Sequence, residues 1–88
     1  MIEVIDVFSK TCVPCKSQKP IIEEMAEQHT DIKFTLLDVA DATDEFLDEH
    51  NIMGVPAILI LKDGEKVYQG KGVHPKELLE AKLEQIQG

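Results

Sequence analysis

The two most apolar strand-like segments of the chain carry hydrophobic side chains on both of their faces. In residues 3–8, Val4 and Phe8 alternate with Ile5 and Val7, and residues 57–61 are apolar throughout. A strand with apolar groups in both directions has to be covered on both faces, which is typical of a sheet packed between helices. This pattern predicts an α/β fold with a buried central strand.

Hydrophobic periodicity and turn signals divide the rest of the chain into short elements. The predicted order is strand 3–8, helix 13–29, strand 32–38, short acidic helix 43–50, strand 57–61, strand 66–69 and a last helix 75–87. Core-facing positions are expected on each helix, namely Ile21, Ile22, Met25 and Ala26 on the first, Phe46 and Leu47 on the second, and Leu79, Leu83 and Ile86 on the third. Pro75 is expected at the first position of the last helix.

The connections between these elements predict how the strands pair. A helix joins the first two strands, so they should be parallel. Asp63-Gly64 is a hairpin signal, so the last two strands should be antiparallel. The result is one domain over residues 1–88, a four-stranded mixed sheet with helices on both faces.

Charge excludes several classes of partner. The 88 residues include 9 Lys and Arg against 17 Asp and Glu, a net charge of −8. A phosphate backbone or an anionic membrane surface would repel such a chain, so we expect neither nucleic acid nor membrane as a partner. The beginning of the chain does not resemble a signal peptide, and we expect a cytoplasmic monomer.

Cys12 and Cys15 are the only cysteines, and they lie where a strand gives way to a helix. The amino-terminal end of a helix favours a thiolate at Cys12, because free N–H groups and the helix dipole point at it. Residues three apart on one turn lie on the same side, so the two sulfurs can meet. Cys12 should be the exposed nucleophile and Cys15 the shielded thiol that resolves a mixed disulfide.

Three other interpretations of the cysteine pair stay open from the residues alone. They are a structural short-loop disulfide, half of a zinc site, and two unreactive core cysteines. No second cysteine pair exists to complete a zinc site, and His29, His50 and His74 are scattered along the chain. We expect these three histidines at the surface and no metal site.

Several motifs together resemble the thioredoxin family. Cys12-Val13-Pro14-Cys15-Lys16 is similar to the family's Cys-Gly-Pro-Cys-Lys, and Met53-Gly54-Val55-Pro56 resembles the segment that ends in its cis-proline. Residues 61–65 resemble the family's hairpin, and Gly72-Val73 resembles the loop before its last helix. The resemblance implies a thioredoxin-like fold with sheet order 2-1-3-4 and the reduction of protein disulfides through the Cys12–Cys15 dithiol.

The resemblance also implies roles for residues outside the cysteine motif. Asp6 lies six residues before Cys12 and matches the family's buried aspartate, which would exchange a proton with Cys15. Its neighbours Val4 and Phe8 on the same face agree, since they should desolvate Asp6 and raise its pKa. Pro56 would be cis and would expose the backbone of Val55 to an extended substrate segment. The implied substrate surface consists of Thr11, Val13, Pro14, Met53, Gly54, Val55, Gly72 and Val73.

Departures from the family pattern leave alternatives open. The family's amino-terminal strand and helix have no counterpart here, which implies a minimal version. Phe8 and Thr11 replace two tryptophans, and Leu37 replaces a lysine near the buried aspartate. No bound cofactor is implied, and electrons would come from a thioredoxin-reductase-type partner fed by NADPH. The alternatives are a glutaredoxin-like hydrogen donor, for example to ribonucleotide reductase, and a non-enzymatic binding module on the same scaffold.

Overall fold

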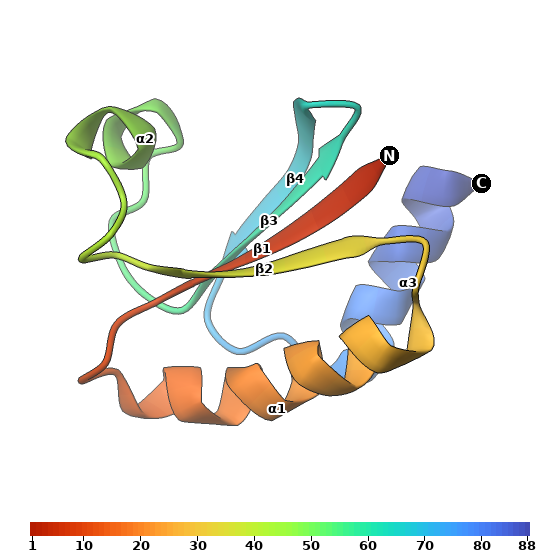
Figure 1. Ribbon diagram of the computed structural model, residues 1–88, viewed down its shortest axis with the longest axis horizontal. Helices are drawn as coiled ribbons and strands as arrows, with labels where there is room; N and C mark the ends of the chain where they lie inside the picture. Colours follow the sequence, from red (N-terminus) through yellow and green to blue (C-terminus); the bar gives the residue numbers. More distant parts are fainter.

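A four-stranded sheet runs through the middle of the molecule, with helices on both of its faces (Figure 1). The computed structural model describes residues 1–88. Its elements are β1 (Ile2–Phe8), α1 (Val13–Gln28), β2 (Lys33–Asp38), α2 (Asp44–Glu49), β3 (Ala57–Lys62), β4 (Glu65–Lys71) and α3 (Lys76–Gln87).

The strands lie in the order β2-β1-β3-β4, as the sequence predicts. β1 is parallel to β2 and antiparallel to β3, and β3 is antiparallel to β4. Asp63 and Gly64 both have positive φ, 53° and 85°, which suits the tight hairpin between β3 and β4. α1 and α3 cover one face of the sheet, and α2 lies on the other (Figure 1).

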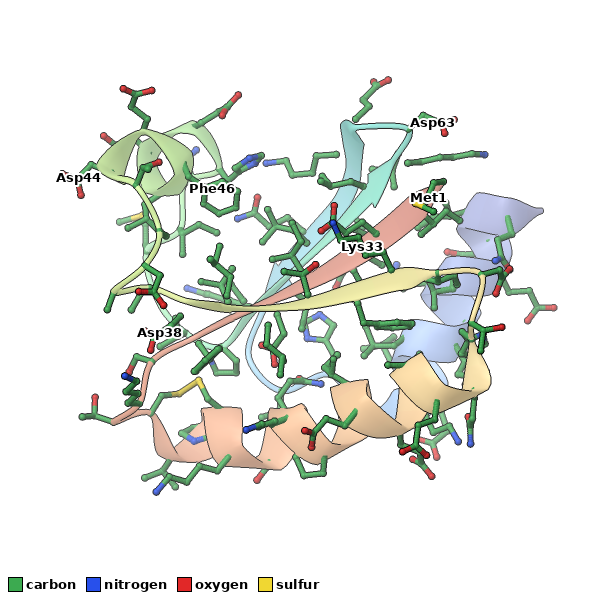
Figure 2. The ribbon with its side chains drawn as sticks, viewed as in Figure 1. Met1, Lys33, Asp38, Asp44, Phe46 and Asp63 are labelled. Carbon is green, nitrogen blue, oxygen red and sulfur yellow. A yellow bond between two sulfur atoms is a disulfide. The ribbon has the colours of Figure 1, made fainter.

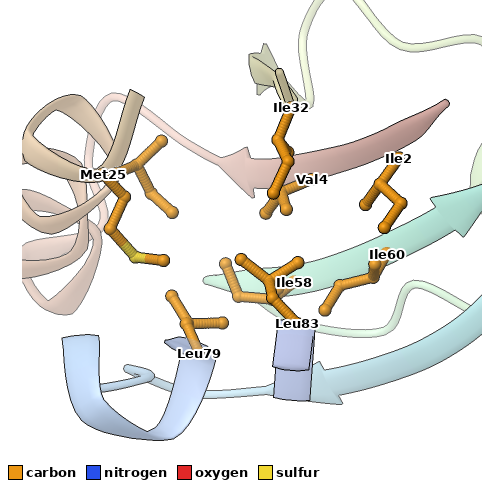
Figure 3. Packing of buried hydrophobic residues seen from close by; sticks show 9 residues of the cluster. Ile2, Val4, Met25, Ile32, Ile58, Ile60, Leu79 and Leu83 are labelled. Carbon is orange, nitrogen blue, oxygen red and sulfur yellow. The ribbon is translucent and has the colours of Figure 1, made fainter. Parts of the chain in front are cut away.

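The apolar side chains of β1 and β3 alternate between two cores. The larger core has nine buried residues between the sheet, α1 and α3, namely Ile2, Val4, Ile22, Met25, Ile32, Ile58, Ile60, Leu79 and Leu83 (Figure 3). The smaller core is Ile5, Val7, Ala57 and Leu59, with Phe46 of α2 packed against it. The two-faced pattern in the sequence therefore reflects a sheet that has a core on each side.

Two expectations about the helices need correction. Ala26 is exposed, because Ile22 and Met25 occupy the inner side of α1 and Ala26 follows them around to the outside. Pro75 is the N-cap of α3, where its carbonyl accepts the N–H groups of Leu78 and Leu79, and the helix proper begins one residue later. On α2, Phe46 packs against the smaller core as expected, although Phe46 and Leu47 are both half-buried.

None of the three helices combines the length and the apolar character that a membrane-spanning helix needs.

Truncating Leu79 on α3 tests the larger core. Leu79 is 1% exposed, and its neighbour Leu78 is 42% exposed. We expect Leu79→Ala to lower the free energy of unfolding by about 2–5 kcal/mol, because it removes buried contacts and leaves a cavity. Leu78→Ala should cost less than about 0.5 kcal/mol. Urea unfolding of both variants measures the difference, and equal losses would contradict this packing.

Candidate active site

The two cysteines form a disulfide at the amino-terminal end of α1. Cys12 is the N-cap of the helix and Cys15 lies in its first turn, with Cα atoms 5.3 Å apart. Figure 2 shows the yellow sulfur–sulfur bond where the loop after β1 enters α1. Cys12 is half-buried, whereas Cys15 is only 4% exposed. The predicted contrast between an accessible and a shielded sulfur is therefore confirmed.

The end of α1 provides a favourable electrostatic setting for a sulfur anion. The Sγ atom of Cys12 accepts the backbone N–H of Cys15 at 3.2 Å, so the sulfur itself caps the helix. The first turn of α1 contains no acidic residue to neutralise the positive end of the helix dipole. Both features stabilise a thiolate at Cys12 when the disulfide is reduced.

Asp6 is buried in the middle of β1, as its apolar neighbours predict. Its side chain is 1% exposed, and neither carboxylate oxygen has a hydrogen-bond partner. Burial raises the pKa of Asp6 from 3.8 to about 6, because it removes the carboxylate from bulk solvent and no protein donor replaces the lost hydration. Asp6 and Cys15 line the same cavity of about 160 Å³, which reaches the exposed Lys16 and Lys19. This cavity connects the carboxyl group, the buried sulfur and the surface.

Pro56 lies at the same end of the sheet as the cysteines, where β1 ends and β3 begins. The Val55–Pro56 bond is cis, as the resemblance implies. Ala57 pairs with Val7, which places the beginning of β3 beside the end of β1. The N–H of Gly72 donates to the carbonyl oxygen of Pro56 at 2.8 Å, so the loop after β4 also lies at this end of the sheet.

The residues proposed as a substrate surface differ in what they expose. Val13, Met53 and Val73 present apolar side chains, 72%, 92% and 41% exposed. Thr11, Pro14 and Gly54 are also exposed, and Gly72 is half-buried. Val55 turns its side chain toward the smaller core. Residues 53–55 make no backbone hydrogen bond within the protein, so their N–H and C=O groups are free to pair with another chain.

The expectation that all three histidines lie at the surface is wrong for His74. His74 is 3% exposed, and its backbone is held by Gln18, which is fully buried on α1. Gln18 continues the buried stripe of α1 that runs through Cys15 and Ile22. A polar residue within such a stripe is a signal that could have been found in the sequence, because a buried amide needs partners.

A larger hollow, of about 390 Å³, contains neither cysteine. It lies between residues 50–54 and β4, and Lys66 and Lys71 are among its lining residues. No three histidine, cysteine or carboxylate side chains lie together in the way that metal ligands would.

Comparison with known proteins identifies the family of the chain. The thioredoxin family model matches residues 2–85. The chain belongs to the thioredoxin family. It is 36% identical over 84 residues to a thioredoxin of Alicyclobacillus acidocaldarius, covering 94% of this chain and 79% of that protein. It is 37% identical over 76 residues to a thioredoxin of Bacillus subtilis, covering 85% and 72% of the two chains.

Solved structures of thioredoxins have the same fold. A mutant thioredoxin from Halobacterium salinarum superposes with a TM-score of 0.86 at 27% identity, over 96% of this chain and 73% of the other. A cysteine pair in this family and this fold makes the protein a thiol–disulfide oxidoreductase that reduces protein disulfides. Thioredoxins carry no bound cofactor, and these relatives favour the thioredoxin interpretation over the glutaredoxin-like alternative.

The raised pKa of Asp6 predicts how the stability of this thioredoxin depends on pH. The carboxyl group keeps its proton up to about pH 6 in the folded protein, but loses it near pH 3.8 in the unfolded chain. Rising pH therefore weakens the fold between these values. We expect Asp6→Asn to stabilise the oxidised protein at pH 7 by about 1–2 kcal/mol, which is less than the full shift would give because the cavity admits solvent to the carboxyl group, and to lose this advantage below about pH 4.

Urea unfolding of the oxidised protein between pH 4 and pH 7 measures this difference. Asp31→Asn is the matched control, because Asp31 is exposed and its substitution should have a small effect at every pH. If the effect of Asp6→Asn on the free energy of unfolding did not change with pH, the raised pKa of Asp6 would be contradicted.

Proposed function

We propose that Cys12 is the nucleophile, that Cys15 resolves the mixed disulfide, and that Asp6 accepts and returns the proton of Cys15. One observation carries this proposal: an accessible sulfur caps α1, and the sulfur bonded to it shares a cavity with an unpartnered carboxyl group.

The first step begins from the reduced dithiol. The thiolate of Cys12, stabilised by the N–H of Cys15 and the helix dipole, attacks one sulfur of a substrate disulfide. A bond forms between Cys12 and that sulfur, while the substrate's own disulfide bond breaks. The second substrate sulfur leaves as a thiolate and takes up a proton from water.

The second step needs the thiol of Cys15 to lose its proton while it is shielded from bulk water. Asp6 is the carboxyl group that lines the same cavity, and with a pKa of about 6 it is mostly ionised at pH 7. The resulting Cys15 thiolate attacks the sulfur of Cys12, and the bond between Cys12 and the substrate sulfur breaks. That substrate sulfur leaves as a thiolate and takes up the proton that Asp6 accepted, so the substrate is released as a dithiol. Two electrons have then passed to the substrate, and the protein holds the Cys12–Cys15 disulfide that the structure shows.

The loops around Pro56, at the end of the sheet beside the cysteines, supply the surface on which a protein substrate binds. The free backbone groups of Val55 pair with an extended substrate segment in the manner of an added strand. Val13, Met53 and Val73 offer apolar contacts on either side. Thr11, Pro14, Gly54 and Gly72 complete this surface.

The protein would act as a reductant in the cytoplasm and receive electrons from an NADPH-dependent reductase of the thioredoxin-reductase type. A thiol reductant suits a compartment in which protein thiols are kept reduced. The net charge of −8 favours a monomer, since like-charged copies repel each other.

Two serine variants test the roles of the cysteines. Cys15→Ser should accumulate a mixed disulfide between Cys12 and a substrate protein, because the second step is blocked. Cys12→Ser should trap nothing and lose disulfide reduction, because the nucleophile is missing. Non-reducing gels and mass spectrometry detect the trapped species. Trapping by Cys12→Ser but not by Cys15→Ser would reverse the assignment.

A paired assay with the unaltered protein tests the electron donor. Insulin reduction is followed once with thioredoxin reductase and NADPH, and once with glutathione. We expect turnover with the reductase. Turnover in the glutathione assay but not in the reductase assay would favour the glutaredoxin-like alternative and overturn the proposed donor.

A further inference from the structure

A buried polar cluster lies behind Gly72 and Val73, and no step of the proposed mechanism uses it. Its side chains are Gln18 of α1, Tyr68 of β4, and His74 in the loop before α3. Gln18 and His74 are almost completely buried, and Tyr68 is half-buried. Buried polar side chains form hydrogen bonds, and the partners in those bonds show which segments of the chain the cluster joins.

The side-chain amide of Gln18 forms hydrogen bonds with both backbone groups of His74, its N–H and its C=O. Its Nε2 donates to the carbonyl oxygen of His74 at 3.0 Å, and its Oε1 accepts the N–H of His74 at 2.6 Å. Gln18 lies one turn after Cys15 on the same buried stripe. The loop is therefore tied to the helix that carries the disulfide.

The imidazole of His74 makes two further bonds, and its partners determine the tautomer. Nδ1 lies 2.8 Å from the carbonyl oxygen of Gly72, which only accepts, so Nδ1 carries a hydrogen. Nε2 lies 2.8 Å from the Tyr68 hydroxyl and, in the neutral ring, accepts its hydrogen. The ring is thus held between β4 and the backbone of Gly72.

These bonds continue into the proposed substrate surface. The N–H of Gly72 donates to the carbonyl oxygen of Pro56, so one chain of hydrogen bonds runs from Tyr68 through His74 and Gly72 to Pro56. Gly70 makes room for this chain. A Cβ atom there would lie 2.7 Å from Nε2 of His74 and closer still to the Tyr68 hydroxyl.

We propose that His74, held by Gln18 and Tyr68, is a positioning residue for protein substrates. It sets the place of Gly72 and Val73 beside Pro56, and so it acts on substrate binding and leaves the chemistry at Cys12 unaffected. This inference rests on the substrate surface proposed above. An apolar pair of similar volume would fill the same space but would supply no directional bonds to hold the loop. It would also leave the backbone N–H and C=O of residue 74 without the partners that Gln18 provides, so some loss of stability is expected.

The double variant Gln18→Leu with His74→Leu tests this role. Pre-reduced protein is mixed with increasing insulin, so that saturation of the rate separates binding from exchange without any reductase. We expect the half-saturating insulin concentration to rise about tenfold, because the loop is no longer held in register. The maximal rate, the rate with bis(hydroxyethyl) disulfide and the reduction potential of the cysteine pair should stay unchanged.

Single variants separate positioning from general destabilisation. His74→Asn retains a donor near the position of Nδ1 and should keep most of the insulin binding that His74→Leu loses. Tyr68→Phe removes one bond and should raise half-saturation about threefold. His29→Leu is the matched control, because it removes a 3.1 Å bond to Glu80 where the other end of α1 meets α3, and it should change nothing.

The substitution Val73→Glu distinguishes failure of this inference from failure of the substrate surface. It places a charge on the proposed surface and leaves the cluster intact. If Val73→Glu weakens insulin binding but the cluster variants do not, the positioning role is overturned. If Val73→Glu has no effect on insulin binding, both the proposed substrate surface and this inference are overturned. Equal losses with insulin and with the small disulfide, or a shifted potential, would also overturn it.

Urea unfolding shows whether each variant is folded. Should the double leucine variant fail to fold, Tyr68→Phe decides the question. In that case unchanged half-saturation in Tyr68→Phe would overturn the proposal.

Discussion

The pairing of β1 with a strand on each side determines where everything else lies. β1 is parallel to β2 and antiparallel to β3, so its backbone groups are used on both edges and its side chains alternate between two cores. One row of these side chains includes Asp6, which faces the layer of α1. Because the chain leaves β1 directly into the loop that ends at Cys12, the same strand supplies both the buried carboxyl group and the position of the disulfide.

The site combines two opposed electrostatic settings within a few residues. The end of α1 stabilises negative charge at Cys12, whereas the interior beside Cys15 destabilises negative charge on Asp6. The first setting suits a nucleophile that is ready to react. The second suits a carboxyl group that exchanges a proton near neutral pH. The loss of stability that burial of Asp6 causes is therefore linked to the role that we propose for it.

Much of the fold was predictable because local patterns and global packing agree. Apolar residues on both faces predicted β1 and β3, and the Asp63-Gly64 turn predicted the hairpin. The accessible Cys12 and the shielded Cys15 followed from their places at a helix start, and the buried Asp6 followed from its apolar neighbours Val4 and Phe8. The position of Ala26 was predicted wrongly, because an apolar residue at helical spacing can still lie just outside the contact face.

By itself, the sequence determined the order of the elements, the two-sided sheet and the cysteine pair at a helix end, since each depends on neighbours along the chain. Only the tertiary structure decided the surroundings of His74. Its partners Gln18 and Tyr68 come from α1 and β4, and Gln18 is 56 positions away along the chain. The burial of a polar side chain depends on which distant groups satisfy its hydrogen bonds, and local periodicity contains no information about those partners.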